Sequence, residues 1–219
     1  MDEIKKNMDP DYGIHGLFPS PVYITKRDLG GVEEDKEIAD LVKEKKIECT
    51  DPDNRGSYTE NTYLFATNLK KLKEFCEQHL KIYTKEVLKI DDKIDFYITQ
   101  SWINVLEPGG NIHSHWHANS IVSGCFYVAT GDDDSLMFSD SNKRLREMIS
   151  LQQKEFNIWN STEWFVPSND NELLLFPSWL VHEVLPNETA TKDRISISFN
   201  TFAKGNLGTA AGLNELVLK

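Results

Sequence analysis

Three histidines stand two residues apart in one short stretch of the sequence. They are His113, His115 and His117, in the segment NIHSHWHANSIVSGCFYV at 111–128. Successive side chains of a β-strand point to opposite faces, so residues two apart share a face. Three imidazoles on one face form a poor apolar core, whereas together they could bind iron, zinc, copper or nickel. The pattern predicts a metal site, with a solvent-facing polar strand as the alternative.

A fourth histidine lies much later in the chain, just after an apolar run. The run LLLF at 173–176 predicts a buried strand, Pro177 and Ser178 indicate a turn, and His182 follows. A lone histidine in this position could equally be a core side chain with a hydrogen-bond partner. His182 is therefore a candidate second contribution to the metal site.

Polar and apolar residues alternate in RISISFN at 194–200. Arg194, Ser196 and Ser198 share one face of the predicted strand, while the other face is apolar. In an edge strand the polar face would meet water, whereas in a small barrel it would line the lumen. In a lumen Arg194 would require an anion, because an unpaired buried charge is costly.

The elements that must position these residues form two groups. A short strand within 12–28, an amphipathic helix from Val32 and a long helix over about 61–88 are expected first, with loop composition at 49–60. After Asp91 the pattern has period two, with at least six strand-like segments separated by turn signals. This predicts a mainly β sandwich or barrel with helices packed outside one sheet.

We expect a single domain over 1–219. Residues 1–90 would form a helical support, 91–205 the catalytic core and 206–219 a tail. A polar insert at 141–163, with Trp159 inside it and Trp164 directly after it, could form a lid or a substrate wall.

Composition narrows the classes of function. A net charge of −11 argues against nonspecific nucleic-acid binding, which depends on Lys and Arg, and against anionic membrane surfaces. The sequence contains no run of 18 apolar residues that would predict a transmembrane helix, and it does not begin with an apolar signal segment. A cytoplasmic location is therefore expected. The three cysteines are scattered and are expected to be reduced thiols.

The ordered motifs resemble the iron(II)- and 2-oxoglutarate-dependent oxygenases, most closely the prolyl-hydroxylase-like branch and a set of bacterial and phage members. The resemblance rests on GGNIHSHWH with SGCFYV, on LLLFPSWLVHEV, on RISISFN and on LFPSPVY near the start. Each piece is short, but the ordered set covers most of the chain.

The resemblance implies a double-stranded β-helix, or jelly roll, that uses iron(II), 2-oxoglutarate and O2. By the family's motif, His115 maps onto the first metal ligand, six residues after Gly109, and His182 onto the distal ligand. The implied reaction is hydroxylation coupled to oxidative decarboxylation of 2-oxoglutarate. No catalytic residue separate from the metal ligands is expected.

The same resemblance assigns the cosubstrate contacts. Arg194 maps onto the residue that pairs with the far carboxylate of 2-oxoglutarate, and Tyr127 onto a tyrosine that helps to hold it. Ser196 completes an Arg-x-Ser pattern found in several members. Asn104 is a further candidate contact with the cosubstrate.

The sequence departs from the family at position 117, where the family has Asp or Glu. Either His117 is the third ligand, which we favour, or water fills that position and His117 lies behind it. His113 could replace His117, since both have the same parity in a strand. Asn119 and Trp116 lie close to the motif and could orient a ligand or the substrate.

Two rival functions remain open. The stretch PGGNIHSHWH also looks like a cupin opening, although cupins usually add a Glu just after the histidine pair and do not call for Arg194. A non-catalytic jelly-roll binding or structural module is the other rival, and it leaves the histidines without a role. Under the oxygenase hypothesis the prime substrate is a peptide or a small molecule, and the oligomeric state is open, a homodimer included.

Overall fold

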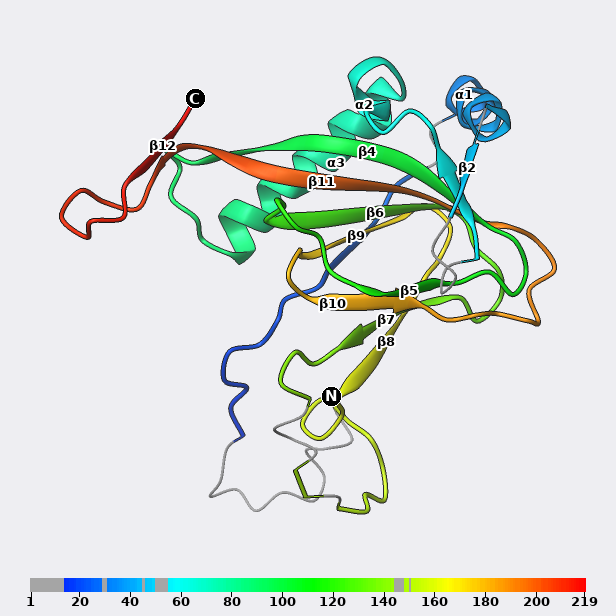
Figure 1. Ribbon diagram of the computed structural model, residues 1–219. Coiled ribbons are helices and arrows are strands. Elements are labelled where there is room, and N and C mark those ends of the chain that lie inside the picture. Colours follow the sequence, from blue (N-terminus) through cyan, green and yellow to red (C-terminus); the bar gives the residue numbers. More distant parts are fainter. Residues whose placement is uncertain (1–13, 29–30, 45, 50–54, 144–147, 150) are drawn as a thin grey trace.

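Two antiparallel β-sheets face each other in the computed structural model, and helices cover the outer face of the larger sheet (Figure 1). The structure describes the chain except residues 1–13, 29–30, 45, 50–54, 144–147 and 150. The predicted fold class is confirmed: the protein is a mainly β jelly roll with N-terminal helices outside the major sheet.

The larger sheet has the order β1-β9-β6-β11-β4-β3-β2, and β12 pairs with the far end of β11. One of its long central strands, β11, contains the alternating segment RISISFN at 194–200. The strands are β1 (Tyr23–Lys26), β2 (Lys46–Glu48), β3 (Ser57–Thr59), β4 (Asp95–Leu106), β6 (Val122–Ala129), β9 (Glu172–Pro177), β11 (Arg194–Leu207) and β12 (Leu216–Leu218).

The smaller sheet has the order β5-β10-β7-β8. It closes the other side of the barrel and brings together strands from distant parts of the chain. Its members are β5 (Ile112–His115), β7 (Ser135–Ser139), β8 (Glu163–Pro167) and β10 (Val181–Val184).

The helices are α1 (Val32–Lys43), α2 (Leu64–Thr67) and α3 (Lys70–Ile82), with a π-helical turn, η2 (Tyr83–Val87), at the end of α3. The predicted long helix over 61–88 is broken at Leu69, which has a left-handed backbone with φ of 53°. The break is stabilised by α1, because the Leu69 amide donates to Glu37 Oε1 at 3.0 Å. Helix periodicity alone therefore could not locate the interruption.

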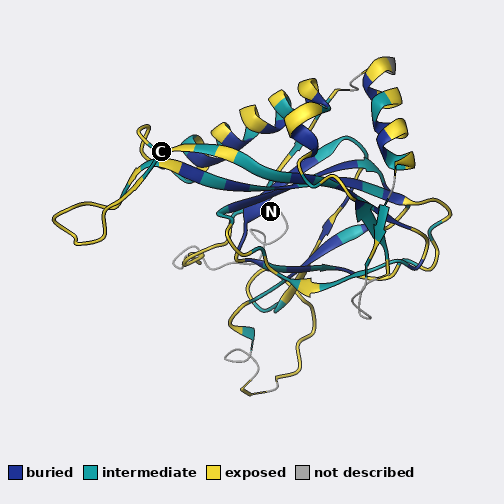
Figure 2. Ribbon diagram, turned by 45° about the horizontal axis from the view of Figure 1, so that its top comes forward, coloured by how far each residue is buried: buried dark blue, intermediate teal, exposed yellow. Residues whose placement is uncertain are grey.

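Each side of the larger sheet faces its own apolar cluster. Ile197 and Phe199 of β11 lie between the sheet and α3, in the cluster that includes Leu72 and Cys76. The opposite face meets the smaller sheet in a second cluster that includes Tyr127 and Phe176. Figure 2 shows the same division, since the helices are exposed outside and buried towards the sheet. The polar face of RISISFN therefore lines the lumen and is not a water-facing edge.

Some local expectations differ from the structure. Residues 49–60, expected to be loop, contain β3, because Ser57 and Tyr58 pair with β4. The described residues of the 141–163 insert form mainly turns, and Trp164 belongs to β8. None of the helices in the described ranges is both long and apolar enough to cross a bilayer.

Candidate functional site

The site begins with two histidines that are cross-strand neighbours. His115 ends β5, and its Cα pairs with that of His182 on the antiparallel strand β10. Their ring centroids are 4.3 Å apart. Sixty-seven residues therefore separate two imidazoles that the smaller sheet places in contact.

His117 reaches the same point from outside the strand. β5 ends at His115, so strand alternation does not place His117, and the predicted row of three histidines on one strand face is incomplete. Instead the His117 amide donates to Ser178 O at 3.0 Å, in the turn between β9 and β10. The fully buried Ser178 hydroxyl also donates to Ser120 Oγ at 2.7 Å. This contact ties the loop after β5 to the turn that precedes His182.

The three imidazoles fit a metal ion. His115, His117 and His182 each offer a nitrogen, and these atoms lie within 4.8 Å of one another. His117 Nε2 and His182 Nε2 are 3.3 Å apart. Two nitrogens bound to one ion at about 2.1 Å, with angles from about 90° to 110°, lie roughly 3.0–3.4 Å apart. The spacing therefore suits ligands of a single ion.

Two of the rings are held by backbone carbonyls. His115 Nδ1 lies 2.8 Å from His113 O, and His182 Nδ1 lies 2.8 Å from Leu180 O. A carbonyl accepts from the protonated nitrogen, so each contact leaves Nε2 with its lone pair towards the cluster. Both rings are thus held in an orientation that would suit metal ligands.

The same surroundings keep the imidazoles neutral. Burial lowers the pKa of all three. Electrostatic repulsion from His115 lowers the pKa of His117 and His182 further. The pKa of His117 falls to about 4 and that of His182 to about 3. All three rings are therefore unprotonated near neutral pH, the state in which imidazole binds a metal.

Three other sequence candidates lie beside the cluster. The ring of His113 is 5.7 Å from that of His115, but His113 is not one of the three converging residues. Trp116 is 64% exposed, and Asn119 is exposed in a left-handed turn with φ of 54°. The geometry thus favours His117 over His113 as the third nitrogen donor.

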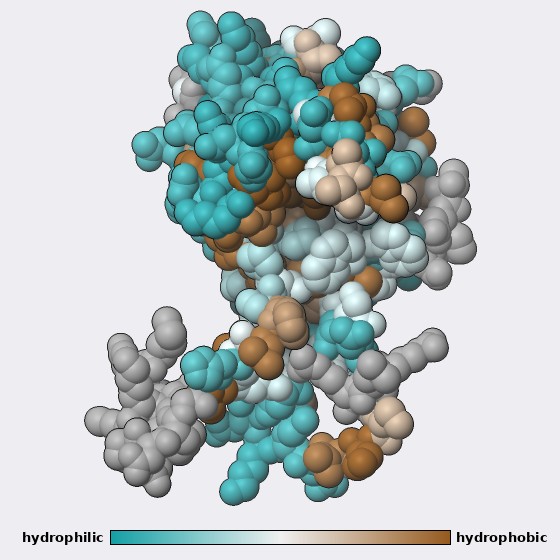
Figure 3. Space-filling model, turned by 90° about the vertical axis from the view of Figure 1, so that its left-hand side faces the viewer, coloured by the Kyte–Doolittle hydropathy of each residue, from teal (hydrophilic) through white to brown (hydrophobic). Residues whose placement is uncertain are grey.

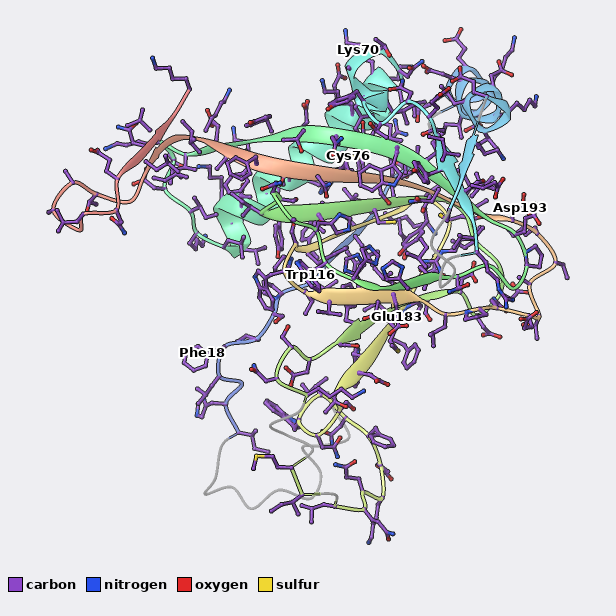
Figure 4. The ribbon with its side chains drawn as sticks, in the orientation of Figure 1. Phe18, Lys70, Cys76, Trp116, Glu183 and Asp193 are labelled. Atoms are coloured by element: carbon purple, nitrogen blue, oxygen red, sulfur yellow. The ribbon has the colours of Figure 1, made fainter. Side chains whose placement is uncertain are left out.

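At the other end of the lumen lies a buried cation. Arg194 is 6% exposed and makes no ion pair with a carboxylate in the described part of the chain. Its guanidinium lies 5.1 Å from the centre of the Tyr127 ring and donates to Ser135 O at 2.9 Å and to Ser168 Oγ at 3.1 Å. A guanidinium has five N–H groups, so donors remain for an anion. Figure 4 shows Asp193, next to Arg194, at the end of the barrel opposite Trp116.

The Tyr127 hydroxyl strengthens the fit to an anion. Tyr127 is fully buried, burial raises the pKa of its hydroxyl, and the oxygen has no hydrogen-bond partner among the described residues. A buried hydroxyl without a partner is costly. Beside Arg194, it is a donor suited to a carboxylate that enters the lumen.

The remaining cosubstrate candidates form one row across the larger sheet. Ser196 of β11 pairs with Asn104 on β4 and with Tyr127 on β6. The Asn104 amide is already engaged, because it donates to Ser198 Oγ at 2.9 Å and its oxygen accepts from Trp102 Nε1 at 3.0 Å. Asn104 therefore braces the lumen wall.

Sequence reasoning missed Trp102 and Asn200. Both lie on the lumen face, and the ring of Trp102 is 6.1 Å from that of His117. The side chain of Asn200 interacts with the same imidazole. Asn200 has the parity of Arg194, Ser196 and Ser198, which was the available signal, but nothing local connects it with His117.

Comparison with known proteins shows what the fold and the central part of the chain are similar to. Residues 100–200 match the family described as "Putative 2OG-Fe(II) oxygenase". That segment holds the three converging histidines and Arg194. The central part of the jelly roll is therefore similar to the 2OG-Fe(II) oxygenases. The cofactors expected from the sequence, iron(II), 2-oxoglutarate and O2, are those of this family.

Solved structures share the fold of this chain at low sequence identity. A prolyl-4-hydroxylase from Pseudomonas putida has a TM-score of 0.54 and 16% identity, covering 82% of this chain and 91% of its own. A prolyl hydroxylase from Trichoplax adhaerens, in complex with a peptide fragment of hypoxia inducible factor, has a TM-score of 0.55 and 13% identity, covering 83% of each chain.

A third structure extends the comparison to another reaction. The epimerase SnoN, in complex with Fe3+, alpha ketoglutarate and nogalamycin RO, has a TM-score of 0.59 and 10% identity, covering 91% of each chain. No curated protein matches the sequence of this chain. The fold is thus common to enzymes that act on peptides and on small molecules.

Proposed function

We propose that this protein is a 2OG-Fe(II) oxygenase that hydroxylates an uncharged residue of a peptide, at an iron(II) held by His115, His117 and His182. The observation that carries this proposal is the convergence of three neutral imidazoles at one end of a lumen, with a buried Arg194 at the other that has no carboxylate partner among the described residues. An ion bound there would supply oxidative chemistry: substrate C–H, 2-oxoglutarate and O2 give the alcohol, succinate and CO2.

The chain's own residues would bind and orient the cosubstrate. Arg194 offers parallel N–H groups to the far carboxylate of 2-oxoglutarate, and the Tyr127 hydroxyl adds a donor to the same group. Ser196 and the braced Asn104 line the wall between that carboxylate and the metal end. Three imidazoles leave bound iron(II) with a charge of +2, which the dianion neutralises.

The mouth of the barrel favours an uncharged substrate. Segments 111–128 and 173–182 contain no Asp, Glu, Lys or Arg. Trp116 and Trp179 lie within these segments and are 64% and 56% exposed. Figure 3 looks onto this end of the molecule, where apolar side chains are visible below the hydrophilic helical layer. Exposed tryptophans that flank a site provide flat apolar contacts, which suit a prolyl or another neutral peptide residue.

An anaerobic titration tests the cofactor assignment. Iron(II) followed by 2-oxoglutarate should produce a visible metal-to-ligand charge-transfer band. Arg194→Ala should shift the half-saturating concentration of 2-oxoglutarate upward at least tenfold, whereas Arg55→Ala, at an exposed arginine, should not. The absence of a band in the wild type, or an unchanged titration of Arg194→Ala, would contradict the proposal.

Labelled oxygen tests the reaction. Proline-containing peptides are incubated with the iron-loaded enzyme, 2-oxoglutarate and 18O2, and mass spectrometry should find one labelled oxygen atom in a peptide for each coupled succinate. Succinate without labelled peptide from any sequence would instead favour a small-molecule substrate or a reaction other than hydroxylation.

A further inference from the structure

The third imidazole differs from the other two in how its ring is held. His115 and His182 each place Nδ1 at 2.8 Å from a backbone carbonyl oxygen, those of His113 and Leu180. His117 directs Nε2 at the metal cluster, because this atom lies 3.3 Å from His182 Nε2. Its remaining nitrogen, Nδ1, needs an acceptor of its own if His117 is to bind a metal through Nε2.

One side chain next to His117 has such an acceptor unused. The Oδ1 atom of Asn200 is shielded from solvent and has no hydrogen-bond partner among the described residues. The Asn200 side chain interacts with the imidazole of His117. A buried amide oxygen without a partner is costly, and an N–H group from the ring would remove that cost.

The position of Asn200 is built into the sheet. It is the last residue of β11 before the register with β4 shifts between Asn200 and Thr201, and its Cα pairs with those of Gln100 and Ser123. Thr201 is fully buried, and its amide donates to Ser120 Oγ at 3.2 Å. The irregularity thus joins β11 to the loop that carries His117.

We propose that Asn200 is the positioning residue of the third metal ligand: its Oδ1 accepts the Nδ1–H of His117 and keeps the Nε2 lone pair on the metal. This rests on the proposed function, in which His117 is a ligand. Asn200 then does for His117 what two backbone carbonyls do for the other ligands. A side-chain acceptor is needed because His117 lies beyond the end of β5, where the strand no longer orients the ring.

A double-mutant cycle on metal affinity tests the proposal without turnover. Iron(II) alone is titrated anaerobically into wild type, Asn200→Leu, His117→Ala and the double variant. Asn200→Leu should weaken iron(II) about 10–100-fold, as loss of a contact behind a ligand does. In the His117→Ala background the same change should have no further effect. Asn200→Asp keeps the acceptor oxygen and should bind iron(II) as tightly as wild type.

The outcomes separate this inference from the proposed function. If His117→Ala binds iron(II) like wild type, the assignment of the third ligand fails and the inference fails with it. If His117→Ala is weakened but Asn200→Leu is not, or if Asn200→Leu is equally costly in both backgrounds, only the inference is overturned.

A spectroscopic measurement on unmutated protein covers the case in which Asn200→Leu does not fold. In the zinc(II)-loaded wild type, 15N-imidazole NMR should show His117 as the Nδ1–H tautomer with its proton protected from exchange. The other tautomer, or a rapidly exchanging proton, would contradict the proposal.

Discussion

At the scale of single residues, the site contains a buried hydroxyl group that has no hydrogen-bond partner among the described residues. The Tyr127 hydroxyl is buried beside Arg194 without a partner among the described residues, whereas the equally buried Tyr83 donates to Pro21 O at 2.9 Å. The two buried tyrosines can therefore be compared directly, since they differ in whether the hydroxyl has a partner. One hydroxyl stabilises the fold, and we infer that the other is reserved for the cosubstrate.

Tyr127→Phe should have opposite effects on stability and on binding. Removal of a hydroxyl without a partner should leave the urea midpoint of the metal-free protein unchanged, or raise the free energy of unfolding by up to about 1 kcal/mol. The affinity for 2-oxoglutarate, measured on the charge-transfer band, should fall about tenfold, since a hydrogen bond to a carboxylate is lost. Tyr83→Phe should cost about 1 kcal/mol of stability and leave that affinity unchanged.

At the scale of elements, the larger sheet depends on close packing on its helix-facing side. Gly124 of β6 pairs with Phe199 of β11, and a Cβ at Gly124 would meet the Phe199 ring at 2.1–2.5 Å. Phe199 is fully buried and lies 6.0 Å from the ring of Phe65, so it has little room to move. The glycine therefore lets β6 and β11 lie under the helical layer.

Gly124→Ala should reduce the free energy of unfolding by about 1–3 kcal/mol, the usual cost of overpacking. Urea unfolding followed by circular dichroism measures it. The control is Gly16→Ala, whose added Cβ would lie at an ordinary 3.6 Å from the Trp159 ring and should change stability by less than about 0.5 kcal/mol. Equal effects of the two substitutions would contradict the packing argument.

We expect the C-terminal hairpin, formed by β12 and the end of β11, to be dispensable for the site. β12 pairs with Gly205–Leu207 of β11, and its residues Leu216 and Val217 are about half exposed. The pair projects away from the barrel (Figure 1). We propose that it is a tail outside the catalytic core. Deletion of residues 209–219 should leave the affinities for iron(II) and 2-oxoglutarate within twofold, and a loss of either in the same titrations would place the hairpin in the core.

Sequence could predict what strand periodicity and motif order determine. The alternation of RISISFN indicates that Arg194, Ser196 and Ser198 share a face, and the resemblance named His115 and His182. The sequence could not predict that the side chain of Asn200 interacts with His117, because this contact depends on a register shift in β11 and on the loop after β5. The break at Leu69 was hidden for a similar reason, since its acceptor comes from Glu37 of another helix.

At the scale of the whole molecule, the two ends of the barrel differ in the charge of their buried side chains. Neutral imidazoles lie at the end that Trp116 marks, and a buried guanidinium lies at the end that Asp193 marks (Figure 4). The substrate and the far carboxylate of 2-oxoglutarate would thus approach the metal from opposite ends. The net charge of the protein is −11, so long-range electrostatics disfavour the approach of nonspecific anions.

The buried imidazoles should make the stability of the metal-free protein depend on pH. An unfolded histidine titrates near 6.5, whereas burial lowers the pKa of His117 to about 4 and that of His182 to about 3. Below pH 6.5 the unfolded chain therefore binds more protons than the folded one, and stability falls as the pH falls. The loss approaches about 1.4 kcal/mol per pH unit for each histidine.

Urea unfolding of the metal-free protein should therefore give a lower free energy of unfolding at pH 5.5 than at pH 7.5, with the stability present above pH 6.5 and lost towards pH 4. His182→Gln removes one of the titrating groups, so its free energy of unfolding should change less between the two values. Iron(II) should increase the stability more at pH 7.5 than at pH 5.5, because protons compete with the metal for the same nitrogens. A wild type whose stability is equal at both values would mean that the imidazoles of the folded protein are not neutral by burial.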